Sequence, residues 1–185
     1  LAGREGDGIR AVRRTLEFAE RVNPLESPSR DVQLSWMLFL EGDRDGARRR
    51  LTSALRRDPN AAEAHLLAAR MLVADGRIET ALEAYARASE LDPDDPAGYL
   101  ARGSLLAAQG RLSPAEAVFS AGLESMPDSV DLRYNLGLTR ALVGDLAAAI
   151  TDFEAVLAAR PGHARALANL AGTLAAAGRF DDAVE

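Results

Sequence analysis

From residue 28 onward, apolar residues recur at three- and four-residue steps, in stretches of about 13 residues separated by glycine or proline. This spacing places the apolar side chains on one face of a helix. None of the stretches has the regular apolar–polar alternation of a β-strand. The pattern therefore predicts an all-α chain built from consecutive amphipathic helices.

Three small or rigid residues repeat along this pattern with a period of 34 residues. The period is marked by glycines, by alanines five residues later and by prolines seventeen residues after the first four glycines: Gly42, Gly76, Gly110, Gly144, Gly178; Ala47, Ala81, Ala115, Ala149, Ala183; Pro59, Pro93, Pro127, Pro161. A fixed period of this length is typical of a repeat array. We expect repeats at 28–61, 62–95, 96–129 and 130–163 and an incomplete one at 164–185, preceded in 1–27 by a half-repeat helix (9–22) and a proline linker.

Each repeat should contain two helices with defined ends. We expect the glycine to end the first helix in a left-handed conformation. A second helix should begin three residues later, with Asp45, Ser113 and Asp181 as caps. A capping box that starts at Asn60, or the pair Asp95-Pro96, should begin the first helix of the next repeat. The alanine allows a close helix crossing, and a large residue fills the gap to the next repeat: Leu51, Tyr85, Phe119, Phe153.

These landmarks resemble the tetratricopeptide repeat, a helix–turn–helix unit of the same length. The fourth repeat carries the pattern most fully, with Leu136-Gly137, Gly144, Ala149, Phe153 and Pro161. Arg102 and Arg140 depart from it, because they stand where the family usually has apolar residues. The resemblance implies a right-handed superhelical solenoid of antiparallel helix pairs, in which first helices line a concave groove that binds peptides.

The resemblance also indicates which residues face that groove. In related arrays, asparagine at the sixth place of a repeat bonds to the backbone of an extended peptide, because its amide offers donors and an acceptor. Only Asn135 and Asn169 match here, so either a partial peptide ladder or drift of the repeat consensus explains them. Their expected neighbours in the groove are Tyr134, Leu138 and Arg165.

The carboxylate clamp of chaperone-binding relatives is incomplete in this chain. Leu100 and Ser104 stand where the third repeat should supply a lysine and an asparagine, and Arg165 matches one basic place. Without these charge-assisted bonds we do not expect binding of chaperone tails.

The first repeat offers different groove residues. Gln33, Trp36 and Phe39 fall on its inward places, and Arg70 falls on an inward place of the second repeat. Because the helix around Trp36 is apolar on all sides, we favour the hypothesis that residues 9–22 or the proline linker cover it. A binding site for an apolar peptide or lipid-like ligand, or a dimer patch, is the alternative.

Charge and composition narrow the function. The formal net charge of -6 argues against a nucleic-acid surface, and all 22 basic residues are arginine, a usage typical of GC-rich bacterial genomes. The second helix of the first repeat concentrates arginines that we interpret as a solvated face balanced by Asp43, Asp45 and Asp58, with an anionic partner or membrane as the alternative: Arg44, Arg48, Arg49, Arg50, Arg56, Arg57.

Signs of chemistry are lacking in the sequence. Cysteine is absent, and His65 and His163 have no partners at metal-ligand spacing. No phosphate-binding loop or nucleophile motif occurs, and no apolar run is long enough to span a membrane. We therefore predict no catalytic residue, cofactor or metal within residues 1–185.

The sequence thus predicts a scaffold or adaptor that binds an extended peptide or a helix of a protein partner. Two alternatives stay open: the substrate-recruiting arm of a larger enzyme such as a transferase, and a structural or envelope assembly protein that self-associates through exposed terminal repeats. Because the chain starts at Leu1 and stops inside an expected helix, we expect a segment of a longer protein. The compartment is open, with the cytoplasm favoured over the periplasm.

Overall fold

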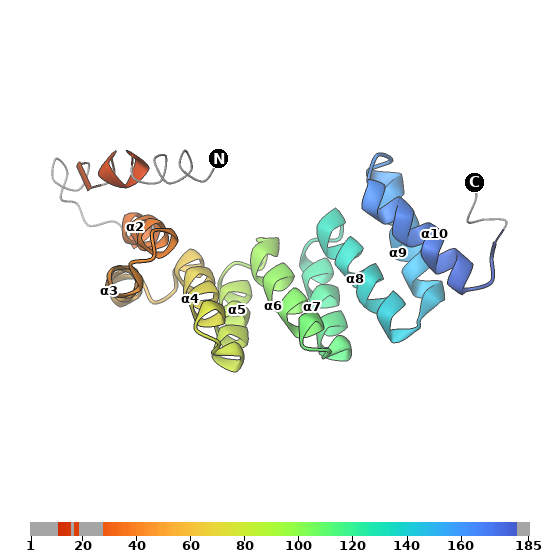
Figure 1. Ribbon diagram of the computed structural model, residues 1–185, viewed down its shortest axis with the longest axis horizontal. Coiled ribbons are helices and arrows are strands. Elements are labelled where there is room, and N and C mark those ends of the chain that lie inside the picture. Colours follow the sequence, from red (N-terminus) through yellow and green to blue (C-terminus); the bar gives the residue numbers. More distant parts are fainter. Residues whose placement is uncertain (1–10, 16, 19–27, 181–185) are drawn as a thin grey trace. The chain divides into compact units, whose positions relative to one another are not determined.

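The computed structural model describes residues 11–15, 17–18 and 28–180, and all regular secondary structure in these residues is α-helical (Figure 1). The helices are α2 (Pro28–Leu40), α3 (Arg44–Arg57), α4 (Ala62–Ala74), α5 (Ile78–Leu91), α6 (Pro96–Ala108), α7 (Leu112–Ser125), α8 (Val130–Val143), α9 (Leu146–Ala159) and α10 (Ala164–Ala176). Of the expected helix 9–22, residues 11–15 and 17–18 are helical, and the rest lies outside the described residues.

Consecutive helices pack in pairs, α2 with α3, α4 with α5, α6 with α7 and α8 with α9, and each pair runs antiparallel (Figure 1). The chain divides into two compact units, Leu1–Leu91 and Asp92–Glu185. The first unit contains α2 to α5, and the second contains α6 to α10. The predicted fold class, an all-α solenoid of antiparallel helix pairs, is confirmed.

The periodic glycines end the first helices, as the sequence predicts. All five have positive φ, between 72° and 93°. At the end of α8, the Gly144 backbone N–H donates to the Arg140 carbonyl at 3.0 Å. A side chain is strained in this left-handed conformation, which explains why glycine occupies the turn within every repeat.

The second helices begin earlier than the sequence predicts. The N-cap of α3 is Asp43, whose carboxylate accepts from the Gly46 N–H at 2.8 Å, and Asp45 lies in the first turn. The α7 helix begins at Leu112, so Ser113 is already inside it. The expected caps Asp45 and Ser113 are therefore wrong, because the left-handed glycine reverses the chain so sharply that the next residue becomes the cap. The third expected cap, Asp181, lies outside the described residues.

The two predicted starts of first helices have different outcomes. Asp95 caps α6 as expected, because its carboxylate accepts from the Ala97 N–H at 3.0 Å. The capping box predicted at Asn60 is wrong, because the N-cap of α4 is Ala61, and no side chain there accepts a capping hydrogen bond. The Asn60 amide oxygen instead accepts from Arg87 at 3.0 Å, which ties the turn to α5.

Each pair of helices crosses at a fully buried alanine. Ala47, Ala81, Ala115 and Ala149 are each 0% exposed, which leaves no room for a larger side chain. The large residues of the second helices are buried beside them. Phe119 and Phe153 lie over glycines of their own repeats, because a Cβ atom on Gly103 would come within 2.4 Å of the Phe119 ring. Phe153 belongs to the same buried cluster as Ala166 of the following repeat, in agreement with the sequence prediction.

Buried ion pairs link the two helices of the first and fourth repeats. In α2, Asp31 is 3% exposed and pairs with Arg50 of α3 at 3.0 Å. The fourth repeat has the reverse arrangement, because Asp152 of α9 is buried and lies 3.8 Å from Arg133 of α8. These pairs occupy the same two places of the 34-residue repeat with the charges exchanged.

Arg140, one of the two departures from the repeat pattern, completes the second of these networks. Its guanidinium bonds to Asp152 at 2.8 Å and to Glu116 of α7 at 2.9 Å. Burial raises the pKa of the Asp152 carboxyl, although the Arg140 guanidinium acts to lower it. The other departure, Arg102, has a buried Nε with no hydrogen-bond partner among the described residues, and nothing in the structure explains it.

We expect Ala149→Leu to lower the free energy of unfolding by roughly 1–3 kcal/mol, because the buried crossing cannot accept three more carbon atoms. The matched control is Ala147→Leu, since Ala147 is exposed on the same helix. Urea unfolding of both variants measures the difference. Equal stabilities would show that the α8–α9 crossing tolerates a large side chain.

We expect opposite effects from two glycine substitutions in first helices. Gly103→Ala should destabilise the protein by about 1 kcal/mol or more, because the new Cβ would overlap the immobile Phe119 ring. Nothing lies within 4 Å of a Cβ on Gly172, so Gly172→Ala should add about 0.5–1 kcal/mol through helix propensity alone. Thermal melts of the two variants check the sign, and a stabilised Gly103→Ala would contradict the ring contact.

Candidate functional site

A cleft of about 240 Å³ lies between α2 and α4, the first helices of two neighbouring repeats. It brings together Gln33, Trp36 and Arg70, three of the residues that the sequence places in the groove. The cleft is completed by four further side chains, Val32, Glu63, Leu66 and Leu67. Val32, Leu66 and Leu67 are buried and form an apolar floor, whereas Gln33, Glu63 and Arg70 are exposed and form a polar rim.

One wall of this cleft is the Trp36 ring, which stacks on the ring of Phe39 beside the cleft. Trp36 and Phe39 lie one turn apart on α2, with ring centroids 5.6 Å apart and an interplanar angle of 17°. The Arg70 guanidinium lies 5.5 Å from the Trp36 ring, and that of Arg44 lies 4.4 Å from the Phe39 ring. Each cation–π contact contributes about 0.5–1 kcal/mol at an exposed site, so the rings are held in place while staying half-buried.

The described part of the N-terminal segment does not cover these rings in the way the sequence suggests. Val12 and Phe18 are 50% and 65% exposed, so the apolar side chains described there are not packed onto α2. The contact seen is polar, because Arg13 pairs with Glu41 just after α2. Our expectation of burial by residues 9–22 therefore does not hold for the residues described, and the proline linker lies outside them.

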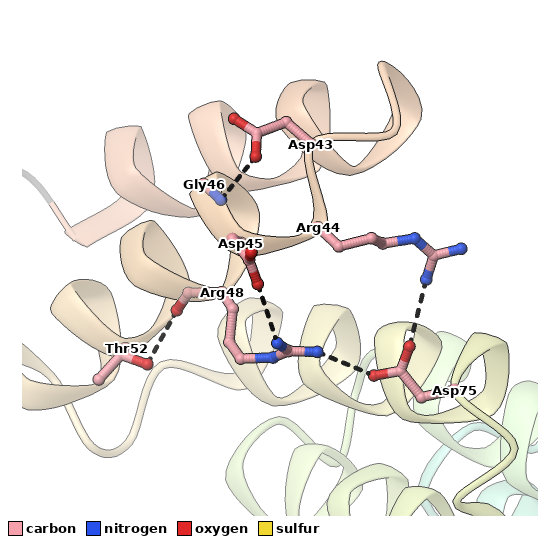
Figure 2. A network of polar contacts seen from close by, with 7 residues as sticks. All are labelled: Asp43, Arg44, Asp45, Gly46, Arg48, Thr52 and Asp75. Atoms are coloured by element: carbon pink, nitrogen blue, oxygen red, sulfur yellow. Dashed lines mark hydrogen bonds and ion pairs between the residues drawn. The ribbon is translucent and has the colours of Figure 1, made fainter.

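Arginines of the exposed face of α3 pair with acids of other helices. Figure 2 shows Asp75, at the end of α4, accepting from Arg44 at 3.5 Å and from Arg48 at 3.2 Å. Arg57, like Arg50, pairs with the buried Asp31.

The acids expected to balance this face have other roles. Asp43 caps α3, and Asp58 accepts from the Asn60 N–H in the next turn. Only Asp45 pairs with a nearby arginine, Arg48, at 3.3 Å. The exposure of this face is as expected, because five of its six arginines are exposed. The expected balance holds only for Arg48 with Asp45 and is otherwise wrong, because the arginines pair mainly with acids of other helices: Arg44 and Arg48 with Asp75, Arg50 and Arg57 with Asp31.

The predicted groove residues of the second unit gather around Tyr134 on α8. The Asn169 amide of α10 donates to the Tyr134 hydroxyl at 2.9 Å. The Tyr134 ring centroid lies 4.9 Å from the His163 ring, and the exposed Arg165 guanidinium lies 5.9 Å from that centroid. We call these four residues the Tyr134 cluster.

Asn135 and Leu138 lie on the same helix as Tyr134 but outside this cluster. The Asn135 amide donates to the Asp131 carbonyl of its own helix at 2.7 Å. Leu138 packs against the buried core around Phe153. An amide carries two donors and an acceptor, so these bonds use only part of what Asn135 and Asn169 can offer.

The two histidines have structural contacts. The His163 Nδ1 accepts from the Ala166 N–H at 3.1 Å and caps α10, and the His65 ring lies 2.8 Å from the Pro59 carbonyl. In the described part of the chain, no group of three or more histidine, aspartate or glutamate residues could hold a metal ion. None of the described helices has the length and apolar character needed to cross a membrane.

Sequence reasoning missed part of the cleft. It named Trp36, Gln33 and Arg70 but omitted Glu63 and Leu66. Glu63 and Leu66 occupy the second and fifth places of their repeat, which also face the groove in the tetratricopeptide pattern. Reading those places in neighbouring repeats as one surface would have found them.

Comparisons with known proteins agree with this architecture. Two family models described as Tetratricopeptide repeat match the chain, one over residues 38–105 and 140–185 and the other over residues 100–150. No protein with a curated description matches.

Several solved structures are similar in fold. MamA is 24% identical, with a TM-score of 0.71 over 85% of this chain and 86% of that one. YrrB, described as a TPR protein with an unusual peptide-binding site, is 22% identical, with a TM-score of 0.68 over 91% and 86%. PilW, described as a widely conserved type IV pilus biogenesis factor, is 25% identical, with a TM-score of 0.67 over 84% and 72%.

The family models together span residues 38–185, and the described helices have the paired arrangement that such repeats form. On this evidence the chain belongs to the tetratricopeptide repeat family.

Proposed function

We propose that this protein is an interaction scaffold that binds an extended peptide or a helix of a protein partner against its first helices. The principal contact in this proposal is the cleft between α2 and α4. We also retain the repeat boundaries given above and the absence of a catalytic centre in residues 1–185 as parts of the proposal.

The observation that carries the proposal is the combination of apolar floor and polar rim in one cleft. The floor is made by side chains that are already buried, Leu66 at 8% and Leu67 at 4% exposure, so it is rigid before any ligand arrives. Burying one aliphatic side chain of a ligand there would contribute about 1.5–3 kcal/mol. The rim residues can then bond to the ligand backbone, which is how grooves select extended peptides.

The Tyr134 cluster and Asn135 are proposed as a second contact. Asn169 is held by the Tyr134 hydroxyl, and its remaining donor and acceptor are available to a peptide unit. The exposed Arg165 adds a cation beside the Tyr134 ring. Leu138 supports this surface from the core side.

One relative supports peptide binding, and another supports the assembly alternative. YrrB is described as having a peptide-binding site, and this chain is similar to it in fold. PilW is described as a pilus biogenesis factor, which favours a scaffold within an envelope assembly as the second candidate function. The recruiting arm of a larger enzyme remains an alternative of the same kind, because it too would work by binding a protein.

Peptides selected from a display library on the wild-type protein should depend on the cleft. We expect Trp36→Ala to weaken the selected peptides by about tenfold or more, as truncation of a central aromatic anchor does. Phe180→Ala is the control, because Phe180 is 67% exposed and lies far along the chain from the cleft. Calorimetric titration measures both, after melting curves show that the variants are folded. If the peptides bound to the wild type and to Trp36→Ala with equal affinity, their binding site would lie outside the α2–α4 cleft.

The second contact has its own test. If a full-length partner crosses the Tyr134 cluster, the Asn135→Ala/Asn169→Ala variant should lose affinity by about three- to tenfold, the loss expected for one or two hydrogen bonds. A matched double variant, Thr151→Ala/Glu154→Ala, changes exposed residues of α9. Pull-down from source-cell extract with quantitative recovery compares them. Unchanged recovery of every partner would remove Asn135 and Asn169 from the site.

A further inference from the structure

The rim of the α2–α4 cleft carries one anion and one cation from the same helix. Glu63 and Arg70 both lie on α4, both are exposed, and both line the cleft. They are separated by seven residues, which is two helical turns and about 10.5 Å along the axis. The floor between them is apolar. The cleft therefore has a negative end and a positive end, joined by an apolar surface.

These two charges differ from four arginines of α3 that pair with acids of other helices. Arg44 and Arg48 pair with Asp75, and Arg50 and Arg57 pair with Asp31, all between helices of the first unit. Among the residues that the structure describes, Glu63 has no hydrogen-bond or ion-pair partner, and Arg70 has no carboxylate partner. The Arg70 guanidinium lies over the Trp36 ring, and an arginine in this position can still donate hydrogen bonds to a carboxylate.

From this arrangement we infer that the cleft is selective for a segment of a protein partner that carries a basic residue, an apolar residue and an acidic residue in a fixed spacing. This inference rests on the proposed function and names the ligand chemistry of the same site. The basic side chain pairs with Glu63, the acidic side chain pairs with Arg70, and the apolar side chain enters the floor between them. Opposite charges on the ligand also compensate the partial desolvation of both rim groups.

The spacing follows from backbone geometry. A polyproline II segment has three residues per turn and a rise of about 3.1 Å, so residues three apart face the same side at about 9.3 Å. That distance is close to the separation of Glu63 and Arg70, and the flexible ends of the side chains absorb the difference. One of the two intervening side chains then faces the floor. Gln33 of α2 lies across the cleft, where its amide can bond to the ligand backbone.

The inference is tested with three capped nine-residue peptides whose central residues are Lys-Leu-Pro-Glu, Glu-Leu-Pro-Glu or Lys-Leu-Pro-Lys, in neutral flanks. Binding is followed by the fluorescence of Trp36, the only tryptophan in the chain. We expect the wild-type protein to bind the mixed-charge peptide about fivefold more tightly than either like-charged peptide, as exposed ion pairs allow. This preference should shrink in high salt.

Charge-reversed variants should change the preference in a defined way. Glu63→Arg should bind the acidic peptide best, and Arg70→Glu should bind the basic peptide best. The double variant Glu63→Arg/Arg70→Glu should again prefer the mixed-charge peptide, bound in the opposite direction. Glu83→Arg and Arg49→Glu make the same charge changes at exposed positions outside the cleft and should keep the wild-type order.

The possible outcomes distinguish charge selectivity from the proposed function, which is peptide binding in the α2–α4 cleft. Equal binding of all three peptides would overturn the charge selectivity. If calorimetric titration, which does not need the tryptophan, shows this binding lost in Trp36→Ala, peptide binding in the cleft stays intact. No binding of any peptide to the wild-type protein would overturn both for this cleft. A preference that stays unchanged in the charge-reversed variants would also overturn the inference, because the selectivity would then arise elsewhere.

Discussion

The close crossing of the two helices in each repeat is the constraint on which the rest of the structure depends. At each crossing an alanine is completely buried, and in the third and fourth repeats an aromatic ring lies over a glycine of the facing helix. Such contacts fix the distance and the relative rotation of the two helices, because packed interiors leave no room for adjustment. Once the rotation is fixed, the face that each first helix turns away from its partner is fixed too. The α2–α4 cleft lies on that remaining face, so its position is a consequence of packing on the opposite side.

The sequence predicted the fold well because its period marks that crossing directly. Glycines at positive φ and buried alanines were both predictable, since only small or flexible residues satisfy those places. The starts of second helices were not, because the capping motif at Ser113 is compatible with either of two starting points and the sharp glycine turn decides between them. Local helix preferences, worth a few tenths of a kcal/mol, are too weak to overcome such a backbone constraint. The environment of Trp36 was also beyond sequence reasoning, since its partner Arg70 lies on another helix.

The ion pairs between helices are the part of the structure that the repeat pattern predicts least. Asp31 and Arg133 occupy the same place in two repeats, and so do their partners Arg50 and Asp152, with the signs reversed. A repeat consensus shows no preferred charge at these places, because the two repeats carry opposite signs there. The structure shows that the same two places form an ion pair in both repeats. Because a buried charge without a partner costs several kcal/mol, each buried aspartate requires arginine partners, and each has two: Arg50 and Arg57 for Asp31, Arg133 and Arg140 for Asp152. The partners of the α3 arginines were missed for a related reason: Asp31 and Asp75 lie on other helices, far away in the sequence.

The difference between paired and unpaired charged side chains also decides which of them are available to bind a ligand. A charge that already holds two helices together cannot be given to a partner without loosening the array, so Arg44, Arg50 and Arg57 are poor candidates despite their exposed surroundings. Glu63 and Arg70 are not committed in this way within the described residues, and both border an apolar floor. Isolated surface charges contribute little to stability, so selection for folding alone does not explain a cation and an anion at the two ends of one cleft. The ligand inferred above, with complementary charges, would account for both, and the half-buried Trp36 ring beside Arg70 would be part of the surface that it contacts.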